Sequence, residues 1–323
     1  MKTLAIIQIL IGLFIFLEMD RIAYVIVTFN GENHIECCIK SIKKFHKDAF
    51  IIIVDNNSQD NTVALVKKLD IDKLIESKEN LGFGKANNLA LEYVVSKNFE
   101  FCFLLNQDVY FLDGDFENFV YNSKIAFQEN YAIVSPLHLS SNKKDFDYKF
   151  VDYISKKNTP GLIESISENK NLNNVYNSKA INAAAWLISK DTILKIGLFD
   201  PLFPHYGEDT DYINRVYYHK KKIGVIPNFK IVHNRSQIEN FQLKDFVNRL
   251  KIWSLVYLKN INIMYLFLLF NFPFQLFKRT KKINYSYFKQ LKLFVKVLFF
   301  SQFNILRILK SRRVSKQTKA FLE

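Results

Sequence analysis

Four short apolar segments, separated by helical patterns, constrain the fold of this chain more than any other feature. They are rich in β-branched or aromatic residues and cover residues 22–28, 50–54, 101–105 and 131–134. Without polar alternation, such runs are typical of strands covered on both faces. Apolar residues recur at three- and four-residue spacing in segments 33–46, 59–69 and 83–97. This alternation predicts an α/β domain whose mainly parallel sheet is flanked by helices.

Polar residues gather where these strands end. Three clusters follow the strands, at residues 28–31, 55–58 and 106–108. Open α/β sheets bind ligands at the carboxyl ends of their strands, so we expect one site assembled from three loops. Residues 138–180, rich in Lys, Asn and Ser, are predicted to be an irregular excursion.

The segment 55–62 places a carboxylate, amides and a hydroxyl between a strand and a helix. One interpretation is that Ser58 or Asp60 caps the helix. The other is functional: Asp55 accepts a hydrogen bond from the N3–H of a uracil or thymine ring, while the amides, Asn57 among them, hold ribose.

Residues 80–88 open a helix with two glycines, a cation and several amides. Backbone N–H groups and the helix dipole favour phosphate there, which makes Gly82 and Lys85 candidate phosphate-binding residues. The GxxxxGK spacing of a Walker loop is missing.

Asp108 follows a wholly apolar strand and has two interpretations. It forms a turn, or it holds Mg²⁺ or Mn²⁺ against a diphosphate. His233 ends a later strand-like run, residues 226–232, and is either structural or a ligand converging on the same place.

Three acidic residues, Glu208, Asp209 and Asp211, open a helix near the end of the α/β pattern. They complement the helix dipole, and Asp211 is predicted to pair with Arg215 at i,i+4. Glu208 and Asp209 are adjacent and cannot both cap the helix. Crowding of two carboxylates raises a pKa toward the range of a general base.

In this order, the segments resemble family 2 glycosyltransferases of the GT-A fold, especially rhamnosyltransferase-like members of bacterial surface-polysaccharide pathways. The resemblance covers about residues 22–235 and rests on segments 27–30, 54–58, 80–88, 105–108 and 197–215. It implies inverting transfer of a sugar from a dTDP- or UDP-sugar, with dTDP-rhamnose among the candidates. The implied acceptor is a hydroxyl of a lipid-linked glycan.

The resemblance also assigns nucleotide-binding residues. Asp55 would contact the base, and Thr28 and Asn30 would contact the nucleotide. Lys85 or Asn87 would contact the ribose and phosphates.

For the chemistry, residues 106–108 stand in place of the family's DxD metal motif. Asp108 would bind Mg²⁺ or Mn²⁺, with His233 as a second ligand. Asp209, beside Glu208, would be the catalytic base. Asn106 replaces the first acid of the motif, so diphosphate oxygens must supply much of the coordination.

Trp186 has two interpretations of its own. Its ring stacks on a sugar or acceptor, or it packs in the core.

The beginning of the chain and its cysteines bear on location. Residues 4–17 are apolar but short of the roughly twenty needed to span a bilayer, so residues 1–18 are a weak anchor or precede a true start at Met19. Cys37, Cys38 and Cys102 lack metal-binding spacing, which favours a reducing compartment. The catalytic domain is predicted at 19–240.

The net charge of +14 is concentrated in the last quarter of the chain. Residues 241–323 hold 17 Lys and Arg against two acidic residues, whereas the first 240 residues balance to −1. Residues 261–277 suit a helix lying in a membrane interface, and a basic cluster that suits anionic headgroups follows them at Lys278, Arg279, Lys281 and Lys282.

The next segment, taken as one helix, is predicted to be amphipathic and basic. Its charged side would carry Lys289, Lys292, Lys296, Arg307 and Lys310, and its apolar side Phe294, Val297, Leu298, Ile305 and Ile308. We expect this tail to bind an anionic membrane surface. The alternative is that it packs on the catalytic domain with a solvated charged side.

Three other functions compete with glycosyl transfer. Another α/β nucleotide enzyme is disfavoured because no GxGxxG follows the first strand. A catalytically degenerate, membrane-bound polysaccharide-assembly protein would explain Asn106. Nucleic acid is not an expected partner of the tail, because its aromatic residues lie on the apolar side. The expected location is cytoplasmic, on the inner face of the cytoplasmic membrane.

Overall fold

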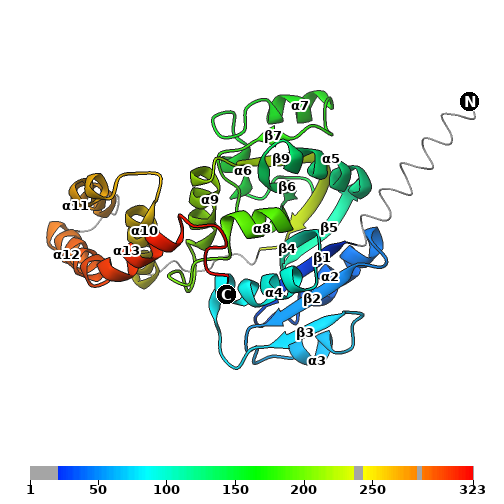
Figure 1. Cartoon of the computed structure of the whole chain (residues 1–323), viewed down its shortest axis with the longest axis horizontal. Coiled ribbons are helices and arrows are strands. Elements are labelled where there is room, and N and C mark those ends of the chain that lie inside the picture. The colour runs from blue at the N-terminus through cyan, green and yellow to red at the C-terminus, as the bar shows by residue number, and fades with distance from the viewer. Residues whose placement is uncertain (1–20, 236–242, 282–285, 323) are drawn as a thin grey trace, which may run out of the picture. The chain divides into compact units, whose positions relative to one another are not determined.

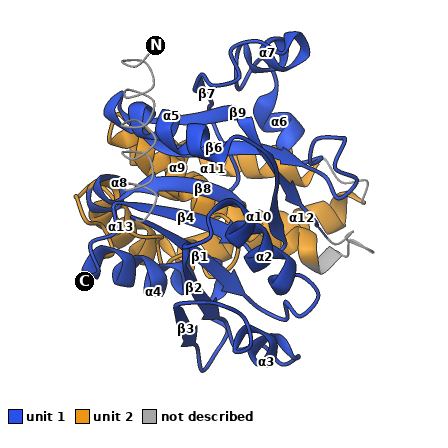
Figure 2. Cartoon of the chain, turned by 90° about the vertical axis from the view of Figure 1, so that its right-hand side faces the viewer, with its two compact units in different colours: residues 1–194, 221–235 blue, residues 195–220, 236–323 orange. Residues whose placement is uncertain are grey.

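The structure is a computed structural model that describes residues 21–235, 243–281 and 286–322. It contains two compact units, shown in different colours in Figure 2. Of the described residues, the first unit holds 21–194 and 221–235, and the second holds 195–220, 243–281 and 286–322. The Glu208-Asp209 segment therefore belongs to the second unit, whereas the sequence suggested a boundary near residue 240.

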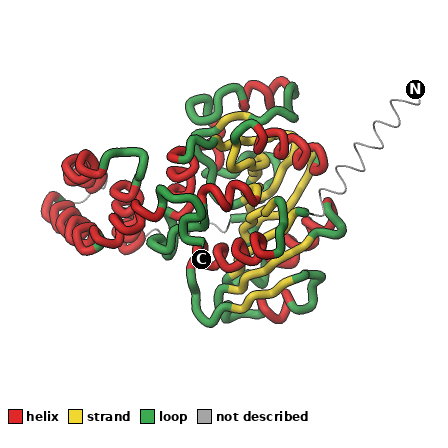
Figure 3. The backbone as a smooth tube through the Cα atoms, viewed as in Figure 1, coloured by secondary structure: helices red, strands yellow, loops and turns green. Residues whose placement is uncertain are grey.

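The first unit is built on a nine-stranded mixed sheet with the order β3-β2-β1-β4-β8-β6-β9-β5, and β7 pairs with β9 (Figures 1 and 3). Strands β3, β2, β1 and β4 are parallel neighbours, as are β6 and β9, while β8 runs antiparallel between β4 and β6. The strands are β1 Ile22–Thr28, β2 Phe50–Asp55, β3 Lys73–Glu76, β4 Phe101–Asn106, β5 Val109–Gly114, β6 Tyr131–Leu139, β7 Tyr176–Asn177, β8 Ala185–Ser189 and β9 Lys222–His233.

All four strands predicted from apolar runs are present as β1, β2, β4 and β6. Helices cover both faces of the sheet, which is why the runs lack polar alternation. Side chains from α2 Ile35–Phe45 and α5 Phe116–Gln128 join one core with alternate residues of β1, such as Tyr24 and Ile26. The buried side of α4 Gly82–Ser96 packs near β1, β2 and β4 outside that core. The short helix α3 Thr62–Val66 lies beside α2.

The excursion at 138–180 is more regular than predicted. It contains α6 Phe150–Ile154, α7 Leu162–Glu168 and the short strand β7. Each helix is anchored by buried apolar residues, Phe150 and Ile154 in α6 and Leu162 in α7. Elements of five to seven residues are too short for a periodic pattern to reveal them.

The second unit is helical. Its helices are α9 Glu208–Tyr218, α10 Leu243–Lys259, α11 Tyr265–Thr280, α12 Tyr287–Phe303 and α13 Ile305–Val314; α8 Lys190–Ile196 runs across the boundary between the units. Leu258, Leu268, Phe272, Val297 and Ile308 belong to a core formed by α10 to α13 and residues 202–203.

The tail differs from the sequence prediction in two respects. Helix α12 ends at Phe303 and α13 begins at Ile305, so a single helical wheel across both was wrong. Val297 and Ile308, predicted for the membrane-facing side, are fully buried in the core, and Phe294 and Leu298 pack against it. That apolar stripe is used for helix packing.

Among the described residues, no helix is long and apolar enough to cross a membrane. The predictions for residues 1–18, for a start at Met19 and for Lys282 fall outside the described residues.

Candidate active site

Strand register brings the polar clusters to one edge of the sheet. Thr28 lies opposite Asp55 in the pairing of β1 with β2, and Val27 lies opposite Asn106 in the pairing of β1 with β4. On the other part of the sheet, Val109 is paired with His233. The expectation that three loops meet at the carboxyl ends of the strands is confirmed.

Asp55 has the features expected of a base-binding carboxylate. It is buried, and its Oδ2 accepts a hydrogen bond of 3.0 Å from the backbone N–H of Ser58. Its Oδ1 is also buried but has no hydrogen-bond partner among the described residues. Leaving such an atom unpaired costs about 1–3 kcal/mol, so a ligand donor such as a pyrimidine N3–H would stabilise it. Asn57, beside it, holds a left-handed backbone conformation with φ 66°.

Gln107 organises the loop after β1. The Thr28 hydroxyl is buried and donates to Gln107 Oε1 at 2.7 Å, and the backbone N–H of Phe29 donates to the same oxygen at 2.9 Å. A Cβ on Gly31 would collide with both Gln107 and Thr28, so the close approach requires glycine. Thr28 and Gln107 therefore shape the loop, and this contact between the first and third polar clusters was not predicted from the sequence.

Asn30 is exposed, and it is hydrogen-bonded to residues of the neighbouring loop. Its Oδ1 accepts from the backbone N–H of Gln59, and its own N–H donates to Ser58 Oγ, both at 2.9 Å. These contacts join the first and second polar clusters.

Asn56 joins the second cluster to the loop before α4. Its Nδ2 donates to Asn80 Oδ1 at 2.9 Å, and its Oδ1 accepts from the Leu81 N–H at 2.7 Å. The N–H of Gly82, in a left-handed conformation, donates to Asn80 Oδ1 at 3.0 Å.

The two side chains predicted to contact ribose and phosphates on α4 differ in exposure. Lys85 is exposed in the first turn, where a phosphate could reach it. Asn87 is buried, and its Nδ2 donates to the Phe83 carbonyl one turn earlier, so that donor is used within the helix.

Asp108 and His233 form the candidate metal pair. Asp108 Oδ1 lies 3.3 Å from His233 Nε2, and Asn106 Nδ2 lies 3.5 Å from the same nitrogen. Burial opposes ionisation of Asp108, but the hydrogen bond and charge of His233, with help from Arg235, outweigh it and lower the pKa of Asp108. Within the described residues, no group of three or more His, Cys, Asp or Glu gathers as a metal site. Two protein donors fit Mg²⁺ or Mn²⁺ if diphosphate oxygens complete the coordination.

Asp147 supports this pair and was missed by the sequence. Its Oδ2 lies 3.6 Å from His233 Nδ1, on the opposite side of the ring from Asp108, and 2.6 Å from Arg235 Nε. Asp147 Oδ1 accepts from the N–H groups of Lys149 and Phe150. At 3.6 Å the approach of Asp147 to His233 is a charge contact, and His233 Nδ1 has no hydrogen-bond partner among the described residues. A carboxylate on that side of the ring favours an orientation in which Nε2 faces Asp108, the position from which it could bind a metal. No sequence signal marked Asp147, because it lies in the excursion predicted to be irregular.

Glu208 and Asp209 lie in the first turn of α9 in the second unit. Glu208 is buried, and its Oε2 has no hydrogen-bond partner in the described part of the chain. Burial, together with the charge of Asp209, raises the pKa of Glu208 to about 7. Asp209 is half-buried and accepts from the Thr210 N–H at 2.6 Å. Burial is the larger cause of this raised pKa and the crowding expected from the sequence the smaller one, and the shifted group is Glu208.

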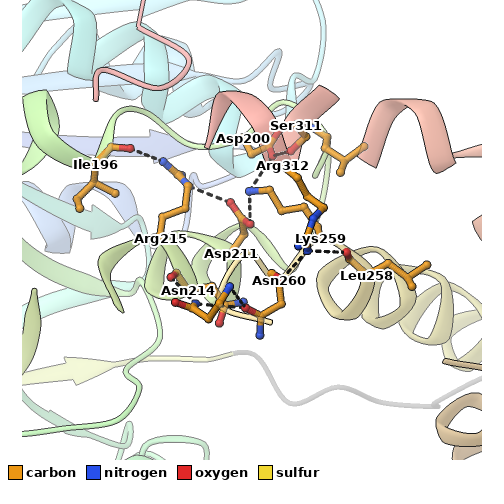
Figure 4. Close-up of polar contacts among 12 residues, drawn as sticks. Ile196, Asp200, Asp211, Asn214, Arg215, Leu258, Lys259, Asn260, Ser311 and Arg312 are labelled. Atoms are coloured by element: carbon orange, nitrogen blue, oxygen red, sulfur yellow. Dashed lines mark hydrogen bonds and ion pairs between the residues drawn. The ribbon is translucent and has the colours of Figure 1, made fainter. Parts of the chain in front are cut away.

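The predicted pair of Asp211 with Arg215 is confirmed, with Arg215 Nε 3.1 Å from Asp211 Oδ2. It belongs to a larger buried cluster (Figure 4). Lys259 contacts both Asp211 and Asp200, and Ser311 also bonds Asp200. The guanidinium of Arg215 donates to the carbonyls at residues 196 and 198. Asp211 is therefore committed to holding α9 in place.

Trp186 is fully buried on β8. Its ring offers no surface to a sugar or acceptor in this structure. Of its two interpretations, the geometry favours core packing.

The order of the sheet and the polar clusters at its carboxyl edge are those of a GT-A-like α/β fold. Residues 24–184 match the family described as Glycosyl transferase family 2. The chain belongs to this family, as the resemblance of its motifs predicted, and it is rhamnosyltransferase-like.

Two curated relatives support this assignment. The dTDP-rhamnosyl transferase RfbF of Shigella flexneri is 28% identical over 218 residues, which span 66% of this chain and 69% of RfbF. A teichoic acid poly(glycerol phosphate) polymerase of Staphylococcus epidermidis is 28% identical over 152 residues. That match covers 43% of this chain and only 20% of the polymerase.

Solved structures share the fold. GalNAc-T7, crystallised with UDP, GalNAc and Mn²⁺, aligns with a TM-score of 0.52 at 14% identity, over 76% of this chain and 51% of its own. TarS of S. aureus aligns with a TM-score of 0.52 at 15% identity, over 91% of this chain and 55% of its own. The chain thus spans about half the length of these two proteins.

Proposed function

We propose that this glycosyltransferase moves a sugar from a dTDP- or UDP-sugar, with dTDP-rhamnose the favoured donor, to a hydroxyl of a lipid-linked glycan during surface-polysaccharide synthesis. The observation that carries the donor class is Asp55 Oδ1, a buried acceptor without a partner among the described residues, at the same sheet edge as Asp108. The similarity to a dTDP-rhamnosyl transferase supports the choice of donor.

In the proposed reaction, Asp55 binds the base and Lys85 contacts the diphosphate. Asp209 accepts the proton of the acceptor hydroxyl as its oxygen attacks the anomeric carbon. The bond from that carbon to the diphosphate breaks in the same step, which inverts configuration. Mg²⁺ or Mn²⁺ held by Asp108 and His233 would neutralise charge on the departing diphosphate.

The raised pKa of Glu208 supports the choice of Asp209 as base. Near neutral pH a large fraction of Glu208 is protonated, so Glu208 adds less negative charge beside a proton acceptor at Asp209.

We also propose that the enzyme works in the cytoplasm at the inner face of the cytoplasmic membrane. The acceptor is lipid-linked, and the excess positive charge lies in residues 241–323. Cys37, Cys38 and Cys102 are free thiols, which fits a reducing compartment.

Thermal-shift measurements with UDP, dTDP and GDP, with and without Mn²⁺, test the donor class. We expect UDP or dTDP to stabilise the protein and Mn²⁺ to increase the effect. Asp55→Asn keeps one oxygen for two donors, Ser58 N–H and the base, so nucleotide affinity should fall about tenfold. Asp209→Asn is the matched variant, and it should bind nucleotide normally but lose transfer.

Two results would overturn the proposal. If no nucleotide stabilised the protein, the degenerate assembly protein suggested by Asn106 would be the better assignment. If Asp209→Asn retained most of its turnover, another group would be the base.

A further inference from the structure

Helices α11 and α12 are apolar on two sides. Their inner sides enter the core of the helical unit through Leu268, Phe272 and Leu276 of α11 and Leu293 and Val297 of α12. Both helices pack against α10 and against each other. The sides turned away from these contacts carry a second set of apolar residues.

The outer stripe of α12 follows helical spacing. Its members are Phe288, Leu291, Val295, Phe299 and Phe303, which fall within about 120° at 100° per residue. Their exposed fractions run from 38% at Val295 to 84% at Phe303. They lie opposite Val297, which is fully buried.

Helix α11 repeats this arrangement with Leu266, Phe267, Phe270 and Phe274. All four are more than half exposed, and Phe270 reaches 84%. We call the nine residues of the two stripes the outer face. Single exposed apolar residues are common on proteins, but nine on adjoining helices mark an interaction surface.

The border of the outer face is basic. Lys289, Lys292 and Lys296 lie beside the α12 stripe, and Lys278 ends the α11 stripe. Arg307 and Lys310 are exposed on α13, next to Leu306, which is 81% exposed. The sequence has no acidic residue between positions 246 and 322.

We propose that the outer face is the surface by which the protein lies on an anionic bilayer, with its aromatic side chains at the acyl boundary and the lysines among the headgroups. A second copy of the chain would oppose one positive border with another, which disfavours self-association. Helices that are apolar on an exposed side and bordered by lysines suit a position in the plane of the interface. This surface would account for the membrane location given under the proposed function. It rests on that function only in assuming that the acceptor lies in the same membrane.

The binding surface is therefore not the stripe predicted from the sequence. Val297 and Ile308, which the sequence placed on the membrane-facing side, are buried in the core. Treating the segment as one helix did not identify the residues that face outward. The two sides of α12 are both apolar, so only packing shows which is free.

Co-sedimentation with vesicles of equal parts phosphatidylglycerol and phosphatidylcholine tests the proposal. The variant Phe270→Ser, Phe299→Ser, Phe303→Ser should bind on the order of a hundredfold more weakly. Lys292→Gln with Lys296→Gln should weaken binding roughly tenfold, and added salt should weaken the unaltered protein. The matched control is Tyr148→Ser with Val151→Ser, which removes two exposed apolar side chains outside the outer face, one just before α6 and one within it. This control should bind vesicles as the unaltered protein does.

Unchanged vesicle binding by the triple variant would refute the proposal. So would equal binding of the unaltered protein to pure phosphatidylcholine, or a dimer in sedimentation equilibrium that the triple substitution disperses. Nucleotide stabilisation without vesicles should be unchanged in the triple variant. If nucleotides failed to stabilise any of these proteins, the proposed donor chemistry would fail while the vesicle result would stand.

Discussion

The buried charge cluster of the helical unit makes Lys259→Met an informative substitution. Lys259 Nζ lies 3.0 Å from Asp200 Oδ2 and also contacts Asp211. These three side chains are at most 2% exposed, and so is Arg215. Methionine keeps most of the volume of lysine but removes its charge.

The magnitude follows from the charge balance. Two carboxylates face two cations in the unaltered cluster, whereas the variant leaves two carboxylates with Arg215 alone. Removing one partner of a buried ion pair costs about 3–5 kcal/mol. We expect the free energy of unfolding of the helical unit to fall by about this amount, a large share of the roughly 5–15 kcal/mol typical of a domain.

Urea unfolding followed by circular dichroism measures the effect. The control is Lys40→Met, which removes a lysine 68% exposed and paired with Glu36 at i,i+4, and it should cost about 0.5 kcal/mol or less.

A second substitution tests the charge argument directly. Asp211→Asn placed in the Lys259→Met background restores the balance of one carboxylate and one cation. The double variant should recover about 1–3 kcal/mol relative to additivity. A loss below about 1 kcal/mol in Lys259→Met, or no recovery in the double variant, would refute the reasoning.

Two further predictions concern the site. The pKa of Glu208 is about 7 in the folded protein, against an ordinary value of 4.5. Protonated Glu208 therefore stabilises the folded state fully below pH 4.5, and this stabilisation is lost as the pH rises through 7. Across this pH range the free energy of unfolding, measured with urea, should fall by at most about 3 kcal/mol in the unaltered protein, and Glu208→Gln should abolish this fall. The same pH profile in the variant and the unaltered protein would contradict the prediction. Asp147→Asn should weaken Mn²⁺-dependent nucleotide binding about 10- to 100-fold while leaving Mn²⁺-free binding unchanged, because it loosens His233. The exposed Asp145→Asn in the same loop serves as control, and equal effects of the two would show that Asp147 has no special role.

Local patterns were sufficient for the elements that build the sheet. Strand β1 is a seven-residue, mostly apolar run, and its place between β2 and β4 fits the burial on both faces that this run predicts. Because polar residues follow these strands directly, the meeting of Asp55 with residues 106–108 at one edge was predictable. The pairing of Asp211 with Arg215 was also predictable, since i,i+4 spacing places both on one side of a helix.

Residues that act through distant contacts left no pattern. Gln107 supports the loop after β1 from 78 or 79 positions away, and Asp147 reaches His233 from a segment with no periodicity. Lys259 meets Asp211 across 48 positions. Such partners are chosen by how the chain packs, and no local spacing encodes them.

The sequence by itself determined the α/β class, the strands that carry the polar clusters and the separation of charge between a nearly neutral domain and a basic tail. These properties depend on residue type and spacing along a short stretch of chain. Tertiary structure decided that Asp55 keeps a buried oxygen without a partner in the described part of the chain, that burial places the raised pKa on Glu208, and that the predicted apolar stripe of the tail is core. Burial and charge compensation depend on neighbours far apart in sequence, so α12, apolar on both sides, revealed its outer face only when the inner one was packed.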